Sequence, residues 1–274
     1  MIESLILIKI IVSIFVVVSL SLVAENVSPK VAGILAGYPL GTAIVLFFVG
    51  IENGITFAAN SAIYALGGLS ASLCFVYIYY KVSSFMPKDN SVSMLVSSAL
   101  SIFGFLCIAQ FFSQISLSLH EGVIVIILAI LLFSFLFRKI DNVTVKAKVK
   151  ITFNVILFRA VTASLIVITI TGVAGYLGEQ WTGVLSGFPI TLYPLLLVIH
   201  LTYGSEQVHT IIKNFPNGMG ALIVYVVSVS YTYPAFGVYW GTVICFALAT
   251  VYLVFYTIIN SIRASKKSLP SAEN

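Results

Sequence analysis

Apolar runs long enough to cross a bilayer follow one another along almost the whole chain, separated by short polar gaps. Of the 274 residues, 60% are hydrophobic and 8% are charged, far from the balance of a soluble domain. We therefore expect an all-α polytopic bundle embedded in a membrane. The gaps leave no room for a separate soluble domain.

Run length and polar gaps divide the chain into nine candidate spanning helices. Periodicity adds little, because lipid-facing and bundle-facing sides are both apolar. The expected ranges are 4–24, 31–51, 56–80, 91–113, 121–137, 151–177, 181–203, 207–233 and 236–262. The eighth range is the least regular, since it contains Lys213, Asn214 and Pro216. The first range also resembles a cleaved secretory signal, although Glu3 and Lys9 disagree with that pattern.

The basic residues fall on one side of this nine-span arrangement. The gaps after the odd-numbered helices, with the polar start of the eighth range counted in the gap after the seventh helix, and the C-terminal segment hold twelve of the fourteen Lys and Arg residues, and the other gaps hold none. The twelve are Lys30, Lys81, Lys88, Arg138, Lys139, Lys146, Lys148, Lys150, Lys213, Arg263, Lys266 and Lys267. Because cytoplasmic loops carry the excess of Lys and Arg, we expect the N-terminus outside and the C-terminus in the cytoplasm. The net charge of +5 then reflects orientation and membrane-lipid contacts, and no nucleic-acid partner is expected.

A sequence motif recurs with an offset of 150 residues: "GILAGYP" at 33–39 and "GVLSGFP" at 183–189. The same offset places Gly68 on Gly218 and Lys9 on Arg159. The first four helices thus match the last four, and the single helix between them turns the second copy upside down. We expect two inverted four-helix repeats. The expected units are the first repeat 1–115, a linker helix with a basic cytoplasmic loop 116–150, the second repeat 151–264 and a cytoplasmic tail 265–274.

Each copy of the motif is expected to break its helix. Proline removes a backbone donor and clashes with the carbonyl four residues earlier, which would leave the carbonyls of Leu35 and Leu185 unpaired. Broken helices at matched positions form the substrate site of inverted-repeat transporters, whereas a simple small-residue helix contact is the alternative. The candidate substrate-binding residues at the breaks are Gly37, Tyr38, Pro39, Gly187, Phe188 and Pro189.

Apart from Lys213 in the polar start of the eighth range, Lys9 and Arg159 are the two basic residues inside expected spans. At about 1.5 Å per residue each lies roughly 12 Å deep, approaching the midplane from opposite faces. A cation there costs at least about 2.5 to 3.5 kcal/mol unless it snorkels to the interface. With no carboxylate expected at matching depth, the pair indicates a site for an anion. Both residues therefore join the candidate substrate-binding set.

Other polar residues give weaker signals. Glu52 at the outer end of the second helix, and Glu206 with His209 at the inner end of the seventh, are candidate gate or proton-relay groups, although carboxylates in loops are common. The spacing of His200, Glu206 and His209 matches no zinc pattern, so neither a metal nor a cofactor is expected. The three cysteines lie inside spans and are interpreted as apolar fillers.

The stretch "TGVLSGFPITLYPLLLVIHLTYGSEQ", together with Arg159 on the preceding helix, resembles the GlpM-like family of small four-helix bacterial membrane proteins. The resemblance covers most of the second half and extends more faintly to the first, which lacks counterparts of Pro194 and His200. It implies a bacterial inner-membrane location and an origin by tandem duplication, but no activity.

The sequence thus favours a secondary transporter or flippase for an anionic small molecule or lipid headgroup, and no enzyme. A non-transporting scaffold or accessory subunit of a cell-envelope assembly is the alternative, and an intramembrane enzyme is a third. An oligomer fits each of them. A transporter is expected to contain a polar cavity between the repeats that reaches Lys9 and Arg159. A scaffold is expected to be packed solid there.

Overall fold

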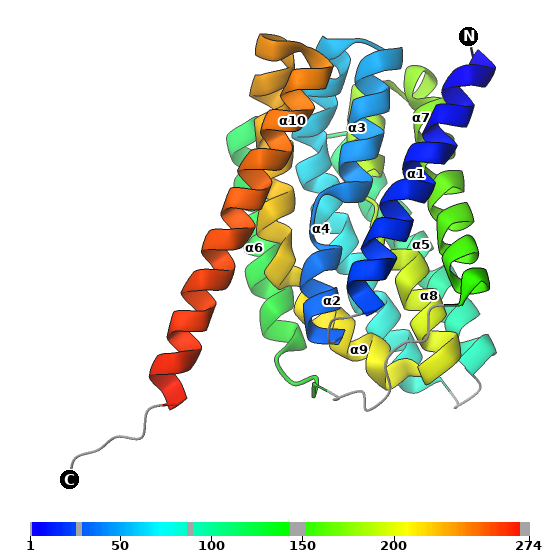
Figure 1. Ribbon diagram of the computed structural model, residues 1–274, viewed down its shortest axis with the longest axis vertical. Helices are drawn as coiled ribbons and strands as arrows, with labels where there is room; N and C mark the ends of the chain where they lie inside the picture. The colour runs from blue at the N-terminus through cyan, green and yellow to red at the C-terminus, as the bar shows by residue number, and fades with distance from the viewer. Residues whose placement is uncertain (1, 26–28, 87–89, 143–151, 269–274) are drawn as a thin grey trace.

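The computed structural model describes residues 2–25, 29–86, 90–142 and 152–268. Every regular element in these ranges is a helix, and most of the helices lie along one long axis (Figure 1). They are α1 (Ile2–Glu25), α2 (Pro29–Ala36), α3 (Leu40–Glu52), α4 (Ile55–Phe85), α5 (Asn90–Ser113), α6 (Leu119–Phe137), α7 (Phe153–Ser186), α8 (Leu192–Tyr203), α9 (Ser205–Asn214), the 3₁₀ helix η1 (Phe215–Gly218) and α10 (Met219–Ser268). Helix α4 is central, since it contacts α5, α6, α7 and α10.

Within the described residues, six helical stretches are long and apolar enough to cross a membrane. They are Ile34–Glu52, Ile55–Phe85, Ser91–Ser113, Leu119–Phe137, Phe153–Ser186 and Ser205–Asn260. Large apolar side chains such as Phe103 on α5 and Leu131 on α6 are exposed on the outer surface, where lipid would cover them. These features are consistent with an integral membrane protein. Two further apolar helices, Ile6–Val16 and Leu192–Tyr203, are shorter.

Both copies of the repeated motif interrupt a helix. Helix α2 ends before the first motif's Gly-Tyr-Pro and α3 follows it, while α7 and α8 flank the second copy in the same way. The expectation of unpaired carbonyls is wrong, because Leu35 O accepts a hydrogen bond from Tyr38 N at 2.9 Å and Leu185 O accepts one from Phe188 N at 3.0 Å. The last turn before each proline tightens to i→i−3 bonds, which satisfies these carbonyls without water.

Helices α7 and α10 each fold back on themselves at a glycine with positive φ. These glycines are Gly178 (φ 80°) and Gly237 (φ 75°). Thr232 Oγ1 lies 3.0 Å from Cys245 Sγ, although 13 residues of straight helix would separate them by about 20 Å. Figure 1 shows α10 rising, turning at the top and descending to its red end. The first reversal falls in the expected gap 178–180, whereas Gly237 lies just inside the expected range 236–262.

Two close backbone contacts are also related by the offset of 150 residues. Gly37 packs against Gly218, and Gly187 packs against Gly68, so closely that a Cβ on Gly37 or Gly187 would lie 2.4 Å from the carbonyl carbon of the facing glycine. Each break therefore sits on a helix of the other half of the chain. The first break contacts the start of α10, and the second contacts the middle of α4.

The two ends of the bundle differ in their basic residues. Helix α1 starts at the upper end in Figure 1, whereas α2 starts, and α6, α9 and α10 end, at or near the lower end. There, Lys213 on α9 donates a hydrogen bond to the carbonyl of Ile140, just beyond α6. The helix ends on which the basic residues gather therefore share the lower end of the bundle.

Candidate functional site

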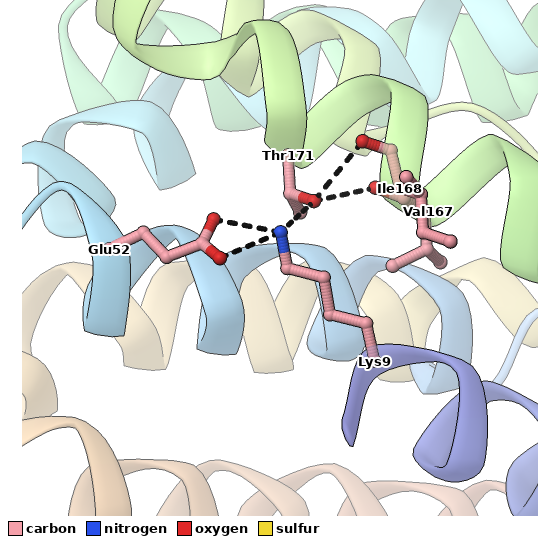
Figure 2. A network of polar contacts seen from close by, with 5 residues as sticks. All are labelled: Lys9, Glu52, Val167, Ile168 and Thr171. Carbon is pink, nitrogen blue, oxygen red and sulfur yellow. Dashed lines mark hydrogen bonds and ion pairs between the residues drawn. The ribbon is translucent and has the colours of Figure 1, made fainter. Parts of the chain in front are cut away.

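Lys9 lies in a polar network between α1, α3 and α7 (Figure 2). Its ammonium Nζ is 2.7 Å from Glu52 Oε1, and it donates a hydrogen bond of 2.7 Å to Thr171 Oγ1. The Thr171 hydroxyl in turn donates to the carbonyl of Val167 at 2.8 Å. The ring of Phe48 lies 5.8 Å from the ammonium. Lys9 is only 3% exposed, so this network keeps a buried cation paired.

The ion pair corrects the expectation that Lys9 has no carboxylate partner. Glu52, expected to be a gate residue, is the last residue of α3, and its side chain is 22% exposed. Counted along their own helices, the backbones of Lys9 and Glu52 lie at different depths. A lysine has a long flexible stem, however, which carries the ammonium away from its own backbone to the level of the helix end.

Arg159 is as buried as Lys9 but is not paired. It lies on α7, is 3% exposed, and its Nε has no hydrogen-bond partner. No ion pair or hydrogen bond connects its guanidinium group to another residue in the described part of the chain. A buried charge without a partner costs several kcal/mol. The two cations at matched positions therefore differ, one with an internal carboxylate and one without.

The two breaks meet at one small pocket. Its lining includes Tyr38 and Thr42 from the first break region and Phe188, Pro189 and Thr191 from the second. The empty volume is ≈ 280 Å³, open space included, but the enclosed part holds about one water molecule. Neither Lys9 nor Arg159 is among its lining residues. This pocket therefore does not extend to either cation, and Gly37 and Pro39 are packed and buried beside it.

The aromatic residue of each break is anchored in the opposite half of the chain. The Tyr38 hydroxyl lies 2.7 Å from Thr250 Oγ1 on α10. Phe188 packs edge-on against Phe75 of α4 and Phe105 of α5, with ring centroids 5.5 and 5.0 Å away. A relative movement of the two halves must therefore change the surroundings of both rings.

The other expected relay residues lie apart from this region. His209 Nε2 is 2.8 Å from Ser83 Oγ of α4, and Glu206 is exposed at the start of α9. No ion pair or hydrogen bond among the described residues joins either of them to Lys9 or Arg159. In the same described ranges, no group of three His, Cys, Asp or Glu side chains could hold a metal ion.

Two polar contacts in the structure have no signal in the sequence. Thr171 is one hydroxyl residue among many in apolar helices, and only the packing of α7 on α1 selects it as a partner of Lys9. His200 is fully buried with Nδ1 2.9 Å from the Tyr79 hydroxyl, while its Nε2 has no partner. The sequence indicates no role for His200 beyond a metal-ligand spacing that matches no zinc pattern. No spacing rule connects it to Tyr79, which lies 121 positions away.

No family model matches the chain, and no curated protein or solved structure matches it. The resemblance to the GlpM-like family is therefore untested.

Proposed function

We propose that this protein is a secondary transporter or flippase for an anionic small molecule or lipid headgroup in the bacterial inner membrane, and that it is not an enzyme. The observation that carries this proposal is the meeting of the two broken helices at one pocket. Broken helices from two inverted halves are a common substrate site in secondary transporters. The buried, unpaired Arg159 favours an anion as substrate.

The proposed architecture is a pair of inverted four-helix repeats, 1–115 and 151–264, with nine spans in all. It would have arisen by duplication of a GlpM-like unit. The reciprocal glycine contacts at an offset of 150 residues support the repeat. Three spans are added to the six long ones: α1 is one, the reversal within α10 divides its stretch into two, and the part of α7 after Gly178 forms one span together with α8. The charge distribution favours an outer N-terminus and a cytoplasmic C-terminus.

The proposed mechanism is a rocking movement of the two halves around the pocket. The pocket has room for about one water molecule in this conformation, so a substrate would need the two halves to move apart. Tyr38 and Phe188 each pack against the opposite half, so movement of the halves would withdraw one ring at a time and open the pocket to one side. Glycines at the contact points let the backbones slide past each other closely.

A scaffold or accessory subunit remains the second candidate, because one observation favours it. The pocket between the breaks is small and does not reach Lys9 or Arg159, as expected for a bundle packed solid at this point. A functional measurement on the full chain separates the two candidates.

The test is to reconstitute the full chain into vesicles of phosphatidylethanolamine and phosphatidylglycerol. Charge movement on addition of carboxylated and phosphorylated metabolites would be measured, and flipping of fluorescent phosphatidylglycerol would be followed by dithionite quenching. We expect activity in the wild type and a loss of about tenfold in Pro39→Ala and Pro189→Ala, equivalent to about 1.4 kcal/mol, because restoring a helical hydrogen bond straightens the break.

Pro234→Ala is the matched control. Pro234 lies inside α10, is exposed and is remote in sequence from both breaks, so its replacement is expected to leave activity unchanged. Folded wild-type protein that moves none of these probes would support the scaffold instead.

A further inference from the structure

The network around Lys9 has a counterpart position in the second half of the chain. Glu52 corresponds to Thr202 at the offset of 150 residues, just as Lys9 corresponds to Arg159. Glu52 and Thr202 each lie two residues before a glycine with positive φ, Gly54 at 99° and Gly204 at 87°. Both glycines occupy the helix boundary, between α3 and α4 or between α8 and α9. The two positions therefore have the same local structure but a different charge.

This difference parallels the different pairing of the two cations. The first half supplies its own carboxylate at 2.7 Å from the Lys9 ammonium. The second half has a neutral threonine in the corresponding position, and Arg159 has no partner in the described chain. A guanidinium group does not lose its proton in a protein, so Arg159 cannot relieve the cost of burial by becoming neutral.

We propose that Arg159 binds a carboxylate group of the substrate, which takes the place that Glu52 occupies beside Lys9. This inference rests on the proposed repeat and transport function, and it names the substrate class as a small carboxylate. Lys9 is then the positioning member of a permanent ion pair and does not contact substrate. One anion site results, in the half of the chain where the internal carboxylate is missing.

The chemistry of Arg159 favours a carboxylate over other anions. The planar guanidinium fork matches the two oxygens of a carboxylate in a bidentate pair. A carboxylate carries one negative charge and neutralises one buried cation, whereas a phosphate monoester with two charges leaves an excess in an apolar site. A phosphodiester also carries one charge, and the Glu52 carboxylate beside Lys9 is what favours a carboxylate over it. Arg159 lies six residues after the start of α7, which is about 9 Å along the helix. With the proposed orientation, the site is nearer the cytoplasmic side.

The test compares carboxylates added in solution with a carboxylate placed on the protein itself, at position 202. The full chain would be purified in detergent, and thermal unfolding would be followed with acetate, succinate or citrate, with acetamide and succinamide as neutral analogues, and with inorganic phosphate. We expect at least one carboxylate to raise the melting temperature of the wild type, and the amides to have no effect. Thr202→Glu is expected to raise the melting temperature without ligand and to abolish the response to carboxylates.

Thr202→Gln is the matched control, since it has the same size as Glu without the charge, and it is expected to respond as the wild type does. A carboxylate response that persists unchanged in Thr202→Glu overturns the inference, as does a wild type that responds only to phosphate or to no carboxylate. Arg159→Met provides a second variant if Thr202→Glu does not fold. It is expected to fold and lose the response, and a retained response overturns the inference.

The result also separates this inference from the proposed function. A carboxylate response that depends on Arg159, in a protein that moves no probe across vesicles, supports the site and refutes transport. Carboxylate transport that is unaffected by Thr202→Glu supports transport and refutes the site.

Discussion

At the scale of single residues, the Lys9–Glu52 pair is unequal in its exposure to solvent. The lysine side chain is 4% exposed and the glutamate side chain is 22% exposed. Removal of Glu52 leaves a buried ammonium with only Thr171 and the Phe48 ring as partners, while removal of Lys9 leaves a carboxylate that water reaches in part. The cost of breaking the pair therefore depends on which partner is removed.

We predict that Glu52→Gln lowers the free energy of unfolding by about 3 kcal/mol and Lys9→Met by about 1 kcal/mol, the latter reduced by the exposure of Glu52. The double variant is expected to be more stable than Glu52→Gln alone, because it contains no stranded charge. Denaturation of the three variants in detergent measures the cycle. Equal single costs that add in the double variant would contradict a coupled pair.

The sequence predicted the two intramembrane cations but not their different surroundings. Lys9 and Arg159 stand out because a basic residue inside an apolar run is rare. Glu52 was predicted as a gate at the helix end, and its pairing with Lys9 depends on how far a flexible lysine stem reaches and on how α1 crosses α3. The spacing of residues in the sequence predicts neither the direction of the Lys9 stem nor the crossing of α1 and α3, since both depend on packing between helices.

At the scale of the helical elements, the two breaks rest on contacts that only glycine permits. A Cβ on Gly37 would lie 2.4 Å from the backbone carbon of Gly218, and a Cβ on Gly187 would lie 2.4 Å from that of Gly68. The neighbouring atoms belong to the backbone and cannot rotate away. An added methyl group must therefore push two helices apart.

We predict that Gly37→Ala and Gly187→Ala each lower the free energy of unfolding by about 2 kcal/mol or more, as overpacking in a tight contact does. Gly172→Ala is the control, because a Cβ at this helical position in α7 meets no other atom within 4 Å. It is expected to be neutral or slightly stabilising, since alanine favours the helix over glycine. Thermal unfolding compares the three variants, and equal effects at all three positions would argue against close backbone contact at the breaks.

The breaks themselves were predictable, because proline after Gly-aromatic is incompatible with a continuous helix. Their internal hydrogen bonds were not. Tyr38 N and Phe188 N close the turn onto the carbonyls of Leu35 and Leu185. The proline that follows each aromatic residue does not by itself specify the φ and ψ values of this turn. The same limit applies to the close approach of Gly37 to Gly218, since the repeat matched each residue to its copy and not to its neighbour in space.

At the scale of the whole molecule, hydropathy and charge predicted the helical bundle and the position of the chain reversals. Gly178 lies in the expected gap 178–180, whereas Gly237 lies two residues beyond the expected gap 234–235, and each sits within what is otherwise a continuous helical stretch. The side of the membrane on which each end lies depends on the positive charges alone. Helix α6 ends close to Lys139 at the same end of the bundle as α9, opposite to the start of α1 (Figure 1).

The orientation leads to a final prediction, on accessibility in sealed cells. In a cysteine-free background, His120→Cys and Gln180→Cys should react with a membrane-impermeant thiol reagent added outside, whereas Lys139→Cys should react only after the cells are opened. All three residues are exposed. His120 and Gln180 are next to Glu121 and Glu179, which form hydrogen bonds with Ser118 and Asn60. Substitution at 120 and 180 keeps these bonds, so the helix ends stay intact. Labelling of Lys139→Cys from outside, with His120→Cys protected, would reverse the orientation and place the Arg159 site nearer the outer surface. Labelling of both from outside would show that α6 does not cross the membrane, and the nine-span arrangement would fail while the contacts between the two breaks would remain.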